Sequence, residues 1–223
     1  MKNIENALVI LAGGLGTRFG KKLPKQFAKI NGENLIHFFL NRIDTNNFDF
    51  IIIVIKNSHY RHVKQLKINF PTVNFLFAKA GKNRQSSSYN ALKILSPYKP
   101  KNVLIHDAAR PFCSNKLVKK ILNQLKKNNS SIPYILSADK KIVSEKEFNK
   151  NLRLIQTPQG YNFKTIFEAH KKTKLNNAKD DSILISEKYL KFIKGEKLNI
   201  KITYSEDINY FKMFIRPIYK SGI

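Results

Sequence analysis

The fold is decided by residues 12–26, which read Ala-Gly-Gly-Leu-Gly-Thr-Arg-Phe-Gly-Lys-Lys-Leu-Pro-Lys-Gln and follow an apolar run at residues 7–11. The apolar run predicts a buried first strand. The glycines after it leave backbone N–H groups free to approach an anion closely. Four cations lie within eight residues of the same loop: Arg18, Lys21, Lys22 and Lys25. A glycine loop at the end of a strand, loaded with positive charge, is suited to bind a triphosphate.

Two other glycine motifs fit this loop poorly. The P-loop pattern requires Ser or Thr after Gly-Lys, whereas Gly20 and Lys21 are followed by Lys22. The dinucleotide fingerprint requires a helix that begins directly at the glycines, but Pro24 interrupts and the last gap is one residue too long. An ordinary glycine-rich turn remains the alternative from this segment alone.

Length and composition indicate a folded globule. With 223 residues the chain can bury a sizeable core in one large domain or two small ones, and we expect a single domain over residues 1–223. A hydrophobic content of 42% argues against a disordered basic chain. The lone cysteine, Cys113, suits a reducing compartment. The first apolar run is too short for a signal sequence or a membrane span, so we expect a cytoplasmic protein with no membrane contact.

The net charge of +26 raises the question of nucleic-acid binding. Of the 41 basic residues 34 are Lys and only 7 are Arg, whereas direct readout of bases relies heavily on Arg. The lysines are spread along the chain, and the Phe and Tyr residues mostly fall in apolar runs. A basic RNA-binding domain, with exposed aromatic residues on its sheet, is therefore the less favoured alternative, and we expect no specific nucleic-acid partner.

Apolar and amphipathic segments alternate along the chain. The apolar segments predict strands at residues 7–12, 48–56, 72–78, 102–107 and 152–157. The amphipathic segments predict helices at residues 35–43, 58–67, 85–95, 115–127, 163–173 and 205–215, with Ser58, Ser114 and Ser205 as N-caps. This alternation predicts a doubly wound α/β fold with a mostly parallel sheet and ligands at the carboxyl ends of its strands. Residues 133–151 break the pattern, and within them 140–151 are polar without helix signals.

The loop also resembles a known family. Leu11 to Phe19, with Pro24-Lys25-Gln26, is similar to the nucleotide-binding loop of the sugar-phosphate nucleotidyltransferases, and most similar to the cytidylyltransferases that act on 2-C-methyl-D-erythritol 4-phosphate. Further segments match in the same order: Gly81 with Arg84 and Ser87, residues 106–111 (His-Asp-Ala-Ala-Arg-Pro), residues 156–160 (Gln-Thr-Pro-Gln-Gly), Asp180-Asp181, and residues 199–203 (Asn-Ile-Lys-Ile-Thr). The resemblance spans about residues 7–213.

The resemblance implies a reaction and partners. The fold would be the Rossmann-like nucleotidyltransferase fold, with an arm around residues 133–151 that reaches the other subunit of a homodimer. A phosphate oxygen of the acceptor would attack the α-phosphorus of CTP, usually with Mg²⁺ or another divalent cation. Such a nucleophile is already ionised near pH 7, so catalysis comes from positioning and cations, without a general base.

The resemblance also assigns roles to individual residues. The catalytic cations would be Arg18 and Lys25, with solvated surface charges as the alternative reading; Lys21 and Lys22 stay surface charges. The nucleotide would be held by Ala12, Gly13, Gly14, Gly16, Gly81, Arg84 and Ser87, although Arg84 and Ser87 also suit an ordinary first helical turn. The acceptor would be contacted by Asp107, Arg110, Thr157 and Lys201, of which Lys201 would neutralise its phosphate. The metal would be held by the CTP phosphates, with Asp107 as one candidate ligand.

Three alternatives accompany those assignments. Asp107 and Arg110 would form an ion pair that only shapes their loop, Lys201 would be an ordinary edge-strand lysine, and His106 is expected to be structural. Two residues on the acceptor side of the site differ from the usual pattern of the resembled family. Asn149, followed by Lys150, stands where the family usually has an Arg donated across the dimer, and Lys179 stands where it usually has a Thr.

Lys150 and Lys179 are therefore candidate acceptor-binding cations. Because both departures affect the acceptor side, a cytidylyltransferase for another polyol phosphate, such as ribitol 5-phosphate, is the alternative enzyme. Residues 216–223 lie past the family match. Some relatives are fused to a second enzyme, so the chain could be part of a longer protein.

Overall fold

The computed structural model describes residues 3–20, 23–30, 32–137, 141–144, 147–149, 152–209 and 212. Its centre is an eight-stranded sheet. The strands of this sheet are β1 (Asn6–Leu11), β4 (Phe50–Ile55), β5 (Phe75–Lys79), β6 (Asn102–Asp107), β7 (Ser130–Leu136), β10 (Arg153–Ile155), β11 (Gln159–Asn162) and β12 (Phe192–Lys194). The strands lie in the order β10-β7-β11-β6-β1-β4-β5, and β12 pairs with β7.

Most neighbouring strands run parallel. Strands β5, β4, β1 and β6 form a parallel block, and β12 is parallel to β7. Strand β11 lies antiparallel between β6 and β7, and β10 is antiparallel to β7. The predicted doubly wound, mostly parallel sheet is therefore confirmed, with antiparallel pairing confined to the half of the sheet beyond β6.

Helices cover both faces of this sheet. They are α1 (Leu35–Leu40), α2 (Leu66–Asn69), α3 (Arg84–Leu95), α4 (Asn115–Leu125) and α5 (Phe163–Lys172). Alternate residues of β1 show the two layers: Leu8 and Ile10 pack with α1, α2 and α4, whereas Ala7 and Val9 pack with α3 and α5. These strand residues are fully buried, as expected for a parallel sheet covered on both sides.

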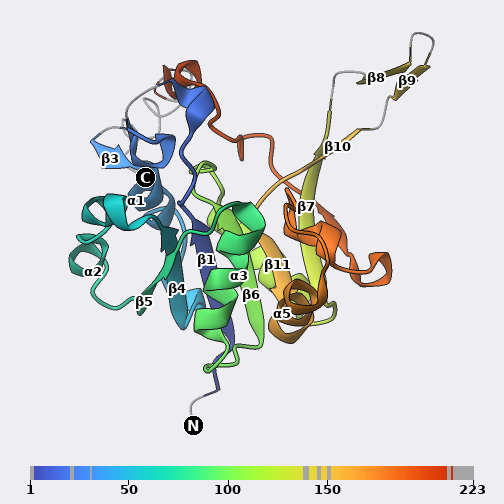
Figure 1. The fold of residues 1–223 in the computed structure, drawn as a ribbon, viewed down its shortest axis with the longest axis horizontal. Coiled ribbons are helices and arrows are strands. Elements are labelled where there is room, and N and C mark those ends of the chain that lie inside the picture. The colour runs from blue at the N-terminus through green and yellow to red at the C-terminus, as the bar shows by residue number, and fades with distance from the viewer. Residues whose placement is uncertain are drawn as a thin grey trace.

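Short elements complete the described chain. The 3₁₀ helices are η1 (Thr17–Phe19), η2 (Lys25–Phe27), η3 (Thr45–Asn47), η4 (Asn57–His62), η5 (Asp181–Leu184) and η6 (Glu187–Tyr189). Two hairpins lie off the main sheet, β2 (Lys29–Ile30) with β3 (Glu33–Asn34), and β8 (Lys141–Ser144) with β9 (Glu147–Asn149). Figure 1 shows the β8–β9 hairpin well away from the body of the sheet, beyond the ends of β7 and β10.

The helix boundaries test the predicted caps. Ser114 caps α4 as predicted, because its side chain accepts a hydrogen bond from the Leu117 N–H. The prediction for Ser58 is wrong, since the segment starts one residue earlier as η4, whose N-cap is Lys56. The predicted helix at 58–67 is therefore split between η4 and α2. Residues 205–209 are helical and begin at Ser205 itself rather than after it.

The carboxyl ends of the parallel strands form one edge of the molecule. In Figure 1 the chain enters β1 from the N-terminus at the bottom, so this edge lies at the upper end of the sheet. The glycine loop begins there, after β1. The loops after β5 and β6 begin at the same edge. Separately, no helix in the described ranges has both the length and the apolar character needed to span a membrane.

Candidate active site

A cavity of about 470 Å³ lies at this edge and gathers most of the predicted site residues. The predicted residues that line it are Gly13, Gly14, Gly16, Arg18, Lys25, Gly81, Arg84, Ser87, Asp107 and Lys201. They come from the loops after β1, β5 and β6 and from the segment after β12, so chain topology alone brings them together.

Gln26 braces the glycine loop through two hydrogen bonds. Its buried amide donates hydrogen bonds to the carbonyl oxygens of Ala12 (2.7 Å) and Gly14 (2.8 Å). In a trans peptide the next N–H points opposite to the carbonyl. Gln26 therefore turns the N–H groups of Gly13 and Leu15 away from itself, where an anion can accept from them. Ala12 is buried and takes part through its backbone rather than as part of the cavity wall.

Two of the loop glycines that line the cavity cannot be replaced without strain. Gly16 has a φ of +66°, and a Cβ there would lie 3.3 Å from the backbone nitrogen of Lys25. At Gly13 a Cβ would collide with the Cβ of Ala80, in the loop after β5. The glycines thus permit close contact between loops that carry different parts of the cavity wall.

The cavity is strongly cationic. Six of its lining residues are basic, and Asp107 is the one acidic residue among them. Burial, together with the nearby charges of Lys201 and Arg18, lowers the pKa of Lys25 to about 8. Phosphates bound beside Lys25 would raise its pKa again and so favour its charged form.

Asp107 lies between two cations. One carboxylate oxygen is 3.3 Å from Nε of Arg84, and the other is 2.6 Å from Nζ of Lys201. Burial alone would raise the pKa of Asp107, but Arg84 and Lys201 hold it well below its usual range. Asp107 is therefore a carboxylate at neutral pH. Its ion pairs are with these two residues and not with Arg110, so the alternative of an isolated Asp107–Arg110 pair is wrong.

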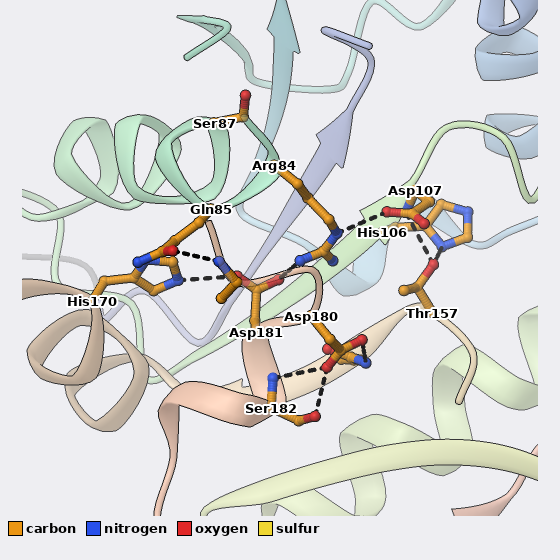
Figure 2. Close-up of polar contacts among 12 residues, drawn as sticks. Arg84, Gln85, Ser87, His106, Asp107, Thr157, His170, Asp180, Asp181 and Ser182 are labelled. Atoms are coloured by element: carbon orange, nitrogen blue, oxygen red, sulfur yellow. Dashed lines mark hydrogen bonds and ion pairs between the residues drawn. The ribbon is translucent and has the colours of Figure 1, made fainter. Parts of the chain in front are cut away.

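The start of α3 is built around Ser87 and Asn83. The Gly81 N–H donates to the Ser87 hydroxyl (3.0 Å), which donates to the Asn83 carbonyl (2.8 Å). Asn83 and Ser86 form a capping box at the same turn. Ser87 therefore fixes the loop after β5, while Arg84 reaches from the first turn to Asp107 and Asp181 (Figure 2).

His106 and Thr157 form a buried hydrogen-bond chain behind Asp107 (Figure 2). The Asp107 N–H donates to the Thr157 hydroxyl (3.0 Å), which lies 3.2 Å from Nδ1 of His106. Because Nε2 of His106 faces the Arg110 carbonyl at 3.1 Å, that nitrogen carries the proton and Nδ1 accepts from the hydroxyl. Burial lowers the pKa of His106 to about 3. His106 is thus neutral and structural, as the sequence predicts.

The structure does not bring Thr157 and Arg110 to the cavity wall. Both hydrogen-bonding functions of the Thr157 hydroxyl are already used, and the side chain is buried. The Arg110 guanidinium donates to the backbone carbonyls of Asn199 (2.7 Å) and Ile155 (3.3 Å). In this chain both side chains brace the loops around Asp107, so the geometry does not support the predicted direct contacts to the acceptor.

The family model for IspD, 2-C-methyl-D-erythritol 4-phosphate cytidylyltransferase, matches residues 6–216. The chain belongs to this family. The bifunctional enzyme IspD/IspF of Pelagibacter ubique is 38% identical over 215 residues, covering 93% of this chain and 57% of that protein. The 2-C-methyl-D-erythritol 4-phosphate cytidylyltransferase of Thermosipho melanesiensis is 33% identical over 214 residues, covering 91% of this chain and 94% of its own length.

Solved structures agree with this membership. The 4-diphosphocytidyl-2C-methyl-D-erythritol synthase of Anaerococcus prevotii superposes with a TM-score of 0.82 at 27% identity, covering 96% of both chains. Against the two bifunctional relatives, from Pelagibacter ubique and Wolbachia pipientis, this chain spans 57% and 58% of their length. Membership of an enzyme family overturns the alternative of a basic RNA-binding domain.

Of the two candidate acceptor cations, only Lys179 belongs to the described residues, and it does not line the cavity. Lys179 is exposed, and its ammonium donates to the Asn177 side chain (3.2 Å). Lys150, Lys21 and Lys22 lie outside the described residues, as do residues 213–223. Asn149 is the last residue of β9 in the β8–β9 hairpin.

The structure also adds residues to the site that the sequence left without a role. Lys56, at the end of β4, and Lys82, in the loop after β5, line the cavity with the predicted cations. Lys56 is the last residue of a predicted strand and Lys82 follows another, which was the available signal, but lysine is too common in this chain to stand out. Gln26 and Asp181 belong to quoted motifs, yet their roles depend on contacts made only in the folded chain.

The residues that line the cavity offer a divalent cation one carboxylate, that of Asp107. In the described ranges, no group of three or more His, Cys, Asp or Glu side chains is placed to hold a metal ion. Asp107 already has two cationic partners. Mg²⁺ in nucleotide sites is usually bound by one or two carboxylates together with substrate phosphates. The donor set therefore suits a metal carried mainly by the nucleotide, with Asp107 as its protein ligand.

Proposed function

We propose that this chain transfers the cytidylyl group of CTP to 2-C-methyl-D-erythritol 4-phosphate and releases pyrophosphate. The observation that carries the proposal is the cationic cavity in which the glycine loop, Arg18 and Lys25 face Gly81, Ser87 and Asp107, in a chain of the IspD family. In the reaction, an acceptor phosphate oxygen forms a bond to the α-phosphorus of CTP. The bond between that phosphorus and the oxygen bridging to the β-phosphorus breaks, and its electron pair leaves with pyrophosphate.

The chain's own residues meet the electrostatic demand of this step. Two polyanions must approach each other, and negative charge grows on the α-phosphoryl group. Arg18 and Lys25 are placed beside the glycine loop to hold the triphosphate and to stabilise that charge. Lys201, which also lines the cavity, is assigned to the acceptor phosphate. Mg²⁺, held by the nucleotide phosphates and Asp107, would supply further charge neutralisation.

Two glycines of the nucleotide half of the site are closely packed against neighbouring residues. Gly13 approaches Ala80, and Gly81 is packed against Ser86, where a Cβ would collide with the Ser86 side chain. Backbone groups at such close quarters can distinguish a pyrimidine from the larger purines by size and hydrogen bonding. Selection of CTP is thus assigned to Gly13, Gly14, Gly81 and Ser87.

We also propose a homodimer and a cytoplasmic location. The β8–β9 hairpin stands away from the body (Figure 1), and Leu136 and Leu154 at its base are 60% and 43% exposed. A second copy of the chain that covers this region would hide that apolar surface. Cys113 is the one cysteine of the sequence and is buried, which suits a reducing compartment.

The direct test is pyrophosphate release by the purified chain with Mg²⁺. CTP, UTP, ATP and GTP are each offered with 2-C-methyl-D-erythritol 4-phosphate, and CTP is then offered with ribitol 5-phosphate and other polyol phosphates. We expect turnover with CTP and the methylerythritol acceptor. Comparable turnover with ATP or GTP contradicts the assignment, and faster turnover with another polyol phosphate changes the acceptor.

A further inference from the structure

Asp181 is a buried carboxylate that the proposed reaction leaves without a role. Its side chain is 1% exposed, and each oxygen has its own partner. One oxygen accepts from Nε2 of His170 (3.0 Å), and the other accepts from Nη1 of Arg84 (Figure 2). Burial alone would raise the pKa of Asp181, but Arg84, and then His170, keep it below its usual range.

His170 in turn is fixed by its surroundings. It lies on α5, 1% exposed at its side chain, and its ring stacks on Tyr89 of α3 with an interplanar angle of 3°. An imidazole held in this way fixes the direction of the carboxylate that it bonds. Asp181 therefore presents its second oxygen to Arg84 in one orientation.

The segment before Asp181 is attached to the same turn of α3. The Gln85 side chain donates to the Leu175 carbonyl (2.6 Å) and accepts from the Ala178 N–H (2.7 Å). Asn83 donates to the Asn176 carbonyl. The residues on both sides of Arg84 thus attach residues 175–178 to the start of α3. This attachment fixes the position of Asp181 relative to Arg84.

Arg84 consequently has a carboxylate at two points of its guanidinium. Asp107 lies by Nε and Asp181 by Nη1, from opposite directions in Figure 2. An arginine side chain loses much of its rotamer freedom when it is fixed. Here that loss occurs during folding, before any nucleotide binds, and Arg84 already lines the cavity.

We propose that Asp181 is the positioning residue of the nucleotide pocket, acting through Arg84, with His170 as its anchor. The inference rests on the proposed function, because it assigns Arg84 to CTP. Asp181 touches neither substrate; it fixes the direction in which Arg84 meets the nucleotide. Removing its charge should weaken CTP binding while it leaves the acceptor side of the cavity, at Lys201, intact.

The test compares Asp181→Asn with Asp180→Asn as a matched control. Asp180 caps η5 and bonds to Gln159; its charge is near Arg84, but no hydrogen bond or ion pair joins it to that guanidinium as one joins Asp181. For Asp181→Asn we expect KM and the calorimetric Kd for CTP to rise about tenfold, the order seen when a group that orients a ligand-binding side chain is removed. KM for the acceptor should change by less than about twofold, and Asp180→Asn should leave both constants near wild type.

A double-mutant cycle separates positioning from a structural role. In an Arg84→Met background, Asp181→Asn should cause no further loss of CTP affinity, because the residue through which it acts is gone. His170→Phe keeps the ring on Tyr89 and removes only the anchor, so it tests the same path if Asp181→Asn does not fold. We expect it to weaken CTP binding in the same direction.

Three results would overturn the inference. The first is a folded Asp181→Asn protein with wild-type CTP affinity, the second is an equal loss in the Arg84→Met background, and the third is wild-type CTP affinity in His170→Phe. Failure of the wild-type chain to bind CTP at all overturns the proposed function together with this inference, so the two failures are distinguishable.

Discussion

Nζ of Lys201 lies 2.6 Å from a carboxylate oxygen of Asp107, although the two residues are 94 positions apart in the chain. The pair joins the end of β6 to the segment that follows β12. It also balances the one negative charge in the cavity wall, so that Asp107 does not repel an incoming phosphate. A cation that is already partnered can turn toward a stronger anion when the acceptor arrives.

The loop cations should matter for rate more than for folding. Arg18→Ala and Lys25→Ala are each expected to reduce kcat by about 10²-fold or more, as for loss of a preorganised transition-state donor. Arg18 is exposed and Lys25 is half-buried, so the melting temperature should stay close to wild type. Steady-state kinetics of pyrophosphate release measure this, with Lys116→Ala on α4 as the control. An increase confined to KM would make both residues ground-state binders.

Lys25 should give CTP binding a pH dependence. Its pKa is lowered to about 8 by burial and by the charges of Lys201 and Arg18. Above that pH the free protein loses the positive charge, so CTP affinity should fall as pH rises through about 8. Lys25→Arg keeps its charge, and calorimetric titrations between pH 7 and about 9.5 should show a smaller fall. Identical profiles for the two proteins would assign the titration to another group.

Gln26 should control the shape of the glycine loop. Gln26→Ala removes two hydrogen bonds to the carbonyls of Ala12 and Gly14 and leaves those carbonyls without a donor. We expect a loss of about 1–3 kcal/mol in unfolding free energy and a several-fold rise in KM for CTP. Denaturant unfolding and kinetics check this against Gln65→Ala, an exposed glutamine. Wild-type values in both measurements would remove the bracing role.

The acceptor side should depend on a lysine in place of the usual arginine. Lys150→Ala and Lys179→Ala are predicted to raise KM for the polyol phosphate while KM for CTP stays nearly unchanged, and Asn149→Arg is predicted to tighten acceptor binding. A lysine can partly replace an arginine as a point charge. The measurement is KM for each substrate in turn. Suppose that neither alanine variant changes the acceptor KM and that a different polyol phosphate is the better substrate. In that case Asn149 and Lys179 would mark a changed acceptor specificity.

Periodicity in the sequence predicted the elements that are long and apolar. Strands β1, β4 and β6 and helices α3, α4 and α5 match predicted segments within a few residues, because burial on both faces imposes continuous or periodic apolar patterns. Strands β11 and β12 were missed. They have four and three residues, and β11 (Gln-Gly-Tyr-Asn) has little apolar character. Pairing with distant strands, rather than local preference, makes them extended.

The site residues also divide into those that local motifs predicted and those whose roles depend on contacts between distant segments. Motifs at strand ends located the glycine loop, Arg84 and Asp107 at one cavity, and the resemblance at residues 199–203 added Lys201 to it. Sequence could not give the direction of the Thr157 hydroxyl, which depends on the tautomer of His106. It also could not pair Arg84 with Asp181, 97 residues away. Contacts of that kind arise only when separate segments pack against each other.

The excess of positive charge around the cavity has a kinetic consequence. Six basic residues and one acidic residue line a single opening, so the local field should speed the encounter with any polyanion, and added salt should slow it. Pyrophosphate is itself a polyanion and meets the same field on its way out. We therefore expect moderate ionic strength to speed the departure of pyrophosphate even as it slows the capture of CTP.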